Sequence, residues 1–229
     1  MKNKTLTIST TKQETIFGWI YLAFQLLALP GILSWANGTM GLSEAELNFC
    51  FFVINFIAVL LIFNKYLSRS FAQVFQHPSY FIQAVILGFV AYYACSWGMN
   101  KLFSWIAPGY TNANDASIAA LSKGNFFLMA IGTVVLVPPV EECFYRGLVF
   151  RNLYGVSRLA AYLVSMAAFA FIHIIGYIGN YSALELLMAF LQYLPAGLCL
   201  AWAYTRAGSI FAPIFIHAAI NYISIRNLI

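Results

Sequence analysis

Charged residues are scarce in this sequence. They make up 8% of its 229 residues, whereas hydrophobic residues make up 62%. A soluble domain carries about a quarter charged residues, so the composition excludes an ordinary soluble protein and indicates an integral membrane protein. No polar, Pro/Ser-rich or charge-rich linker divides the chain, and we therefore expect a single membrane domain over residues 1–229 with the lipid bilayer as its surroundings.

The sequence also lacks clusters of basic residues. Its net charge is +5, but the 12 Lys and Arg residues are scattered singly. Binding of nucleic acid requires such residues to gather on one face. Nucleic acid is therefore excluded as a partner.

Paired cysteines and internal repeats are missing as well. The four cysteines show no CxxC spacing, which argues against a disulfide framework or a zinc knuckle. The absence of a repeat disfavours a transporter built from two inverted halves.

Long apolar segments are what the sequence does have. A helix needs roughly 20 apolar residues to cross the hydrocarbon core, and the first such run is too long for the core of a cleavable signal peptide. The apolar windows are 16–36, 47–63, 80–99, 125–147, 159–178, 183–204 and 209–226. They predict an all-α fold, a polytopic transmembrane bundle of about seven to eight membrane helices.

Basic residues in short loops predict the orientation, because cytoplasmic loops are enriched in Lys and Arg. With the N-terminus in the cytoplasm, most basic residues lie inside, and we expect the plasma membrane as the location. The inside set is Lys2, Lys4, Lys12, Lys65, Arg69, Arg151, Arg158 and Arg206, and the outside set is Lys101, Lys123 and Arg226.

The sequence also predicts the local structure of three shorter segments. Residues 66–76 read as an amphipathic surface helix, and residues 101–108 as an extension of the third span. The polar stretch 109–124 reads as a loop.

Ionisable residues at membrane depth mark the candidate site, because each costs several kcal/mol in lipid and normally faces a protein interior or a wet cavity. They are Glu141, Glu142, Arg146, His173, Glu185 and His217, with Asn221 as a polar neighbour. Glu185 falls near a helix start, where its charge suits the helix dipole. The others form the candidate set.

The estimated depths of these residues place polar groups from three helices in the same middle layer of the membrane. At about 1.5 Å per residue, Glu141 lies about 15 Å from the cytoplasmic end of its helix, His173 about 22 Å, His217 about 14 Å and Asn221 about 20 Å. We therefore expect one shared site.

Spacing within the helices assigns partners. Glu142 and Arg146 are four residues apart and can pair on one helix face, whereas Glu141 points about 100° away and stays unpaired. Pro138 and Pro139 remove backbone donors just before this pair, and such a break in a membrane helix usually borders a cavity.

An unpaired carboxylate, a histidine and a donor pair around a wet pocket suit the hydrolysis of a peptide bond. Glu141 with His173 would hold a water and take its proton. His217 and Asn221, again four residues apart, would donate hydrogen bonds to the oxyanion.

Three motifs carry a family resemblance: EECFYRG at 141–147, FAFIH at 169–173 and GSIFAPIFIHAAINY at 208–222. In order and spacing they resemble the EExxxR, FxxxH and HxxxN motifs of the CPBP family, the intramembrane CAAX proteases and bacteriocin-processing enzymes also called Abi proteins. The resemblance covers about 125–226, expected as the catalytic core, with 1–124 as variable N-terminal helices.

The resemblance implies a role for each residue of the set. In the family the first Glu and first His activate water, the second Glu and the Arg support them, and the last His and Asn form the oxyanion site. The corresponding residues here are Glu141 and His173, then Glu142 and Arg146, then His217 and Asn221. The implied function is an intramembrane endopeptidase acting on a membrane-associated peptide or a lipidated protein.

The family was long labelled metalloprotease, but the sequence lacks the HExxH motif of a typical zinc protease. We therefore expect no cofactor. The alternative is a divalent metal such as zinc on Glu141, His173 and His217.

Other readings of the same residues stay open. Cys143 could be a thiol nucleophile, and the charged residues could form a purely structural network. A non-catalytic membrane regulator or bacteriocin-immunity scaffold of the same fold, with a regulatory membrane partner, is the alternative function.

Overall fold

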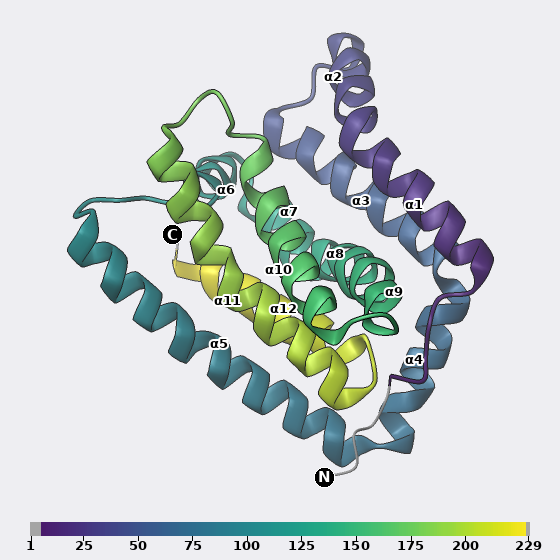
Figure 1. Cartoon of the computed structure of the whole chain (residues 1–229). Coiled ribbons are helices and arrows are strands. Elements are labelled where there is room, and N and C mark those ends of the chain that lie inside the picture. Colours follow the sequence, from purple (N-terminus) through teal and green to yellow (C-terminus); the bar gives the residue numbers. More distant parts are fainter. Residues whose placement is uncertain (1–5, 228–229) are drawn as a thin grey trace.

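A computed structural model of the chain describes residues 6–227, and Figure 1 shows these residues as a bundle of helices. The first half contains α1 (Lys12–Leu27), α2 (Leu29–Met40), α3 (Glu44–Ile62), α4 (Asn64–Gln76), α5 (Pro78–Ile106) and α6 (Ala113–Gly124). One long helix follows, made of α7 (Phe126–Ile131), the π-helix η1 (Gly132–Leu136), α8 (Val137–Glu142), the π-helix η2 (Cys143–Phe150) and α9 (Arg151–Tyr154). The last elements are α10 (Arg158–Ile175), α11 (Ala183–Ala207) and α12 (Phe211–Asn227).

The all-α polytopic bundle is confirmed, but the count of seven to eight spans is wrong for the described residues. Five helices are long and apolar enough to cross a membrane, or up to six if the bent pair α1 and α2 is one span. The five are Glu44–Ile62, Pro78–Ile106, Phe126–Tyr154, Arg158–Ile175 and Ala183–Ala207. The window 16–36 bends by 51° between α1 and α2, next to Pro30, and the structure describes 17 residues of α12.

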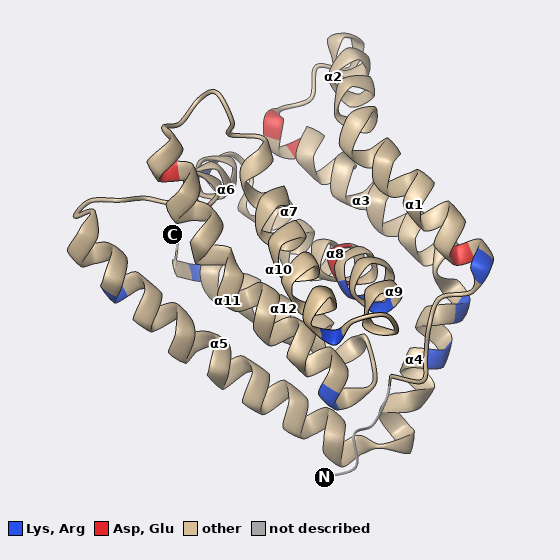
Figure 2. Ribbon diagram, viewed as in Figure 1, with Lys and Arg blue, Asp and Glu red and all other residues tan. Residues whose placement is uncertain are grey.

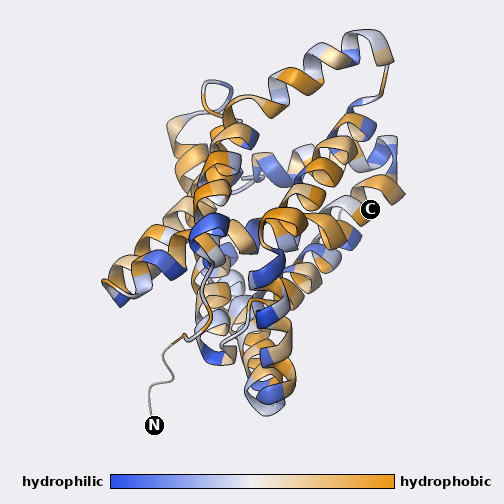
Figure 3. Cartoon of the chain, turned by 90° about the vertical axis from the view of Figure 1, so that its right-hand side faces the viewer, coloured by the Kyte–Doolittle hydropathy of each residue, from blue (hydrophilic) through white to orange (hydrophobic). Residues whose placement is uncertain are grey.

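The outer surface of the bundle is apolar. Large side chains on the outer helices are exposed, among them Ile57 of α3, Ile86 of α5 and Leu163 of α10, and the hydropathy colours of Figure 3 show the same apolar character along the helices. Such a surface needs lipid around it. The apolar helices thus indicate an integral membrane protein.

Basic residues are unevenly distributed between the two ends of the bundle. In Figure 2 basic positions gather where α4, α9 and the last turn of α11 lie, whereas the acidic first turns of α3 and α11 lie at the opposite end. The expected orientation is based on this uneven distribution of Lys and Arg, because cytoplasmic loops are enriched in these residues. The orientation itself stays a prediction.

Two of the three short segments match their expectation. Residues 64–76 form α4, which buries Tyr66 and Ser70 and exposes Phe71 and Phe75, and α5 continues to Ile106.

The expectation of a loop over 109–124 is wrong, because residues 113–124 form α6. Its capping signals are present in the sequence. The side chain of Asn112 accepts hydrogen bonds from the backbone N–H groups of Asn114 and Asp115, and Asp115 and Lys123 suit the helix dipole at the two ends.

Glu14 joins α1 to the start of α4. Its Oε1 accepts a hydrogen bond of 2.7 Å from the backbone N–H of Tyr66, and its Oε2 one of 2.7 Å from that of Thr11. Since α4 has no cap from its own side chains, Glu14 supplies it from another helix. Glu14 is buried, and Arg69 lies 3.6 Å from its Oε2.

Replacing Glu14 with alanine is expected to lower the free energy of unfolding by about 1–3 kcal/mol, because buried N–H donors lose their partner. Glu14→Gln is the matched control, since its amide oxygen can still accept from Tyr66. Titration with a denaturing detergent, followed by circular dichroism, measures both. Equal losses for the two variants would contradict the capping role.

Candidate active site

Four elements carry the six candidate residues to one region of the bundle. Glu141 and Glu142 end α8, and Arg146 lies in η2. His173 lies near the end of α10, and His217 and Asn221 lie on α12.

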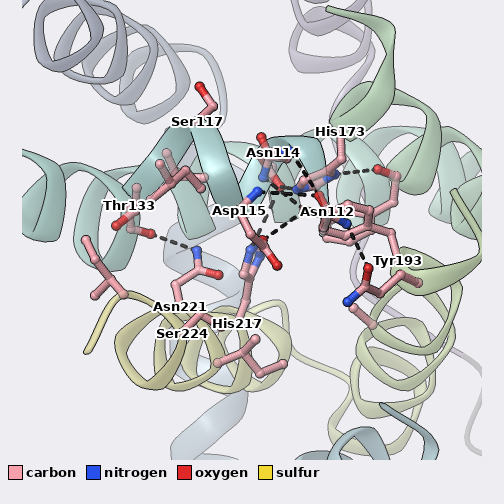
Figure 4. A pocket seen from close by; sticks show the side chains of 18 of the residues that line it. Asn112, Asn114, Asp115, Ser117, Thr133, His173, Tyr193, His217, Asn221 and Ser224 are labelled. Atoms are coloured by element: carbon pink, nitrogen blue, oxygen red, sulfur yellow. Dashed lines mark hydrogen bonds and ion pairs between the residues drawn. The ribbon is translucent and has the colours of Figure 1, made fainter. Parts of the chain in front are cut away.

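The proline break has a specific consequence for one carbonyl. The N–H of Val137 bonds to Gly132 O, in the i→i−5 pattern of a π-helix, and Pro138 has no N–H. Neither nearby backbone donor can therefore reach Thr133 O. Asn221 takes the place of these donors, because its Nδ2 donates to Thr133 O at 2.8 Å, as Figure 4 shows.

Glu142 and Arg146 form a fully buried ion pair. Arg146 Nη1 lies 3.0 Å from Glu142 Oε1, and both side chains are 0% exposed. Arg146 also donates from Nη2 to Gly197 O at 3.2 Å and lies over the ring of Phe169, 4.4 Å from its centroid. The pair thus ties the long helix to α10 and α11.

His217 connects the two glutamates. Its Nδ1 lies 2.9 Å from Glu142 Oε1 and its Nε2 lies 3.9 Å from Glu141 Oε2. Because a carboxylate only accepts, Nδ1 carries a hydrogen and donates it to Glu142. Nε2 then donates only when the ring carries both protons.

Glu141 and His173 face each other without direct contact. His173 Nε2 lies 3.8 Å from Glu141 Oε2, and this oxygen is buried without a hydrogen-bond partner. The Nδ1 of His173 lies 2.7 Å from Phe169 O. Since the carbonyl accepts, the neutral ring has its hydrogen on Nδ1 and a lone pair on Nε2, directed at Glu141.

Two cavities meet at these residues. One of about 300 Å³ is lined by Glu141, His173, His217 and Asn221, together with polar residues of α6. The second, of about 460 Å³, shares Glu141 and His173 and extends between α1, α3 and α10. Glu142 and Arg146 lie behind the cavity wall, because neither lines it.

Sequence reasoning missed the wall formed by α6 and Tyr193. Asn112, Asn114 and Asp115 line the first cavity, as Figure 4 shows. Tyr193 of α11 stacks on His173 with ring centroids 4.1 Å apart, and its hydroxyl accepts from Asn114 Nδ2 at 2.9 Å. The helix-capping signal at Asn112 could have located this wall.

Two alternative chemistries can be compared with the geometry. Within residues 6–227 no group of three or more His, Cys, Asp and Glu side chains is arranged to hold a metal ion. Cys143 is 0% exposed, packs in the apolar core and lines neither cavity. A thiol nucleophile at this position could not reach a substrate there.

The fold and the site define a polytopic membrane protein with a polar cavity between its helices. Residues 123–223 match the sequence model of the family described as type II CAAX prenyl endopeptidase Rce1-like. The chain therefore contains an Rce1-like CAAX prenyl endopeptidase domain of the CPBP family over these residues, and the resemblance is confirmed. Comparison with curated proteins and with solved structures finds no match. The domain implies intramembrane protease activity.

Proposed function

We propose that this protein is an intramembrane endopeptidase that hydrolyses a peptide bond of a membrane-associated peptide or protein with a water activated by Glu141 and His173. The observation that carries the proposal is the unpartnered Oε2 of Glu141, which faces the Nε2 atoms of both histidines across a cavity. Distances of 3.8 and 3.9 Å are too long for direct hydrogen bonds. Glu141 Oε2 therefore keeps its hydrogen-bonding capacity for a water bound in the cavity beside these atoms.

The water would donate one hydrogen bond to Glu141 Oε2 and one to His173 Nε2. Both of these atoms accept in the forms described above, so a lone pair of the water oxygen stays free for the substrate carbonyl carbon. As the oxygen attacks, its proton passes to Glu141. The same proton then goes to the leaving amine when the C–N bond breaks, and the products are a carboxylic acid and an amine.

His217 and Asn221 are the proposed donors to the oxyanion. Since His217 Nδ1 is committed to Glu142, the ring donates from Nε2 only as an imidazolium. That form balances the charges of the site, because Glu141 and Glu142 carry two negative charges and Arg146 and His217 two positive ones. Asn221 has a second N–H on Nδ2 beside the one given to Thr133 O.

Glu142 and Arg146 would act through His217. Their buried ion pair fixes Glu142 Oε1, which in turn fixes the ring of His217. We assign them positioning roles.

The second cavity is the proposed binding place of the substrate. Its lining combines apolar side chains such as Phe51 and Ile172 with four amides, Gln25, Asn48, Asn55 and Asn114. Apolar walls suit a membrane-associated substrate, and the amides can hydrogen bond to its peptide groups.

Cleavage by the purified protein tests the function. In proteoliposomes with an acyl-anchored peptide library, we expect cleavage by the parent and a loss of about 10²–10⁴-fold in His173→Ala. The control is Ser224→Ala, which changes the cavity wall without touching the proposed machinery. Parent-level cleavage by a folded His173→Ala variant would refute the proposal.

Dialysis against a chelator, in the same assay, distinguishes the prediction of no cofactor from the alternative of a bound divalent metal. Cleavage that survives dialysis against the chelator is the expected result. Loss of cleavage that added zinc restores would instead support a metal on Glu141, His173 and His217.

A further inference from the structure

The first cavity contains a second carboxylate that the proposed reaction does not use. Asp115, in the first turn of α6, lines this cavity together with Glu141, His173 and His217. Figure 4 shows Asp115, His173 and His217 around the same cavity. A group bound beside the reacting carbonyl would therefore lie within reach of Asp115.

The charge of Asp115 has no fixed counter-charge. Among the described residues, the hydroxyl of Tyr193 on α11 donates a hydrogen bond to its Oδ1, at 3.5 Å. Within residues 6–227 it forms no ion pair with Lys or Arg, and no Lys or Arg lines the cavity. Arg146 is engaged behind the wall with Glu142, and the ring of His217 also donates its Nδ1 hydrogen to Glu142.

The local surroundings make this isolated charge costly. Burial raises the pKa of the Asp115 carboxyl, whereas His173 and the hydrogen bond from Tyr193 act in the opposite direction. A cation placed beside Asp115 would offset the cost of burial, because desolvated opposite charges attract strongly. A carboxylate placed there, such as the free C-terminus of a CAAX tail, would meet two negative groups.

We propose that Asp115 is a specificity-determining residue, which selects substrates with a Lys or Arg side chain close to the scissile bond. This rests on the proposed function, since it deepens the description of the same site. Asn112 and Asn114 hold Asp115 in place through the cap of α6 and the bond to Tyr193. The other polar side chains that line the first cavity would accept hydrogen bonds from an ammonium or guanidinium group.

Cleavage of defined peptides by the full chain in proteoliposomes tests the selection. Mass spectrometry of cut products from an acyl-anchored library should show Lys or Arg enriched at a fixed distance from the cut bond. Four peptides that carry Lys, Arg, Gln or Glu at that position then give kcat/KM. We expect Asp115→Asn to lower it about 10–100-fold for the Lys and Arg peptides, and to change it less than about threefold for the Gln peptide.

Two further variants separate charge selection from a structural effect. Asp115→Lys should shift the preference toward the Glu peptide. Glu44→Gln removes an exposed carboxylate in the first turn of α3 that lines neither cavity, and it should change nothing. Equal cleavage of the Lys, Gln and Glu peptides, or an equal loss for all of them in Asp115→Asn, would overturn the proposal.

A binding measurement tests the specificity role of Asp115 even if the endopeptidase proposal fails. If no peptide is cut, the endopeptidase proposal fails, and the affinities of fluorescent Lys and Glu peptides for Glu141→Gln still report the selection. The Lys peptide should bind at least about tenfold more tightly, and adding Asp115→Asn should abolish the difference. Equal affinities in Glu141→Gln would refute the role of Asp115.

Discussion

Replacing Glu141 with glutamine is expected to lower kcat/KM for peptide cleavage by about 10²–10⁴-fold, the usual contribution of a general base. Glutamine has the size of glutamate but cannot take a proton from water. Glu141 Oε2 accepts no hydrogen bond from the protein, so the substitution removes no interaction that holds the fold. The free energy of unfolding should therefore change little.

The matched control for this loss of charge is Glu44→Gln, which replaces an exposed carboxylate in the first turn of α3. Single-turnover cleavage in proteoliposomes compares the two variants, and circular dichroism verifies that both are helical. Full activity of a folded Glu141→Gln variant would contradict activation of water by this residue.

Replacing Arg146 with methionine is expected to cost about 3–5 kcal/mol of stability, because it leaves a buried carboxylate without its counter-charge. Arg146 and Glu142 are both 0% exposed, and Arg146 also bonds to Gly197 O and covers Phe169. A loss of this size is a large part of the stability of most proteins. We therefore expect a low yield of folded Arg146→Met.

A double variant separates the charge from the packing. Glu142→Gln combined with Arg146→Met removes both charges and keeps an amide oxygen that can accept from His217. It should recover part of the stability that Arg146→Met alone loses, measured by denaturing-detergent titration. If Arg146→Met is as stable as the parent, the ion pair does not hold these helices together.

The fold was predictable in class and only partly in detail. Apolar length identifies α3, α5, α10 and α11 because each is one uninterrupted helix. It overcounts elsewhere, since hydropathy does not register the bend between α1 and α2. Apolar length also missed α6, because this helix is too polar to appear as an apolar segment. Its capping residues were nevertheless present in the sequence.

For the candidate site, spacing indicated which residues would meet, whereas their hydrogen bonds needed the structure. Depth and spacing predicted that Glu141, His173, His217 and Asn221 share a region, and they line one cavity. The catalytic roles stay predictions. That His217 donates to Glu142 depends on how α12 is rotated against α8, which no spacing within a helix specifies.

The most direct test is a high-resolution structure of the protein in a lipid nanodisc, with ordered water visible. We expect a water within hydrogen-bond distance of both Glu141 Oε2 and His173 Nε2, in a cavity that includes His217 and Asn221. A dry contact between these side chains, or a Glu141 carboxylate paired with a cation elsewhere, would contradict it.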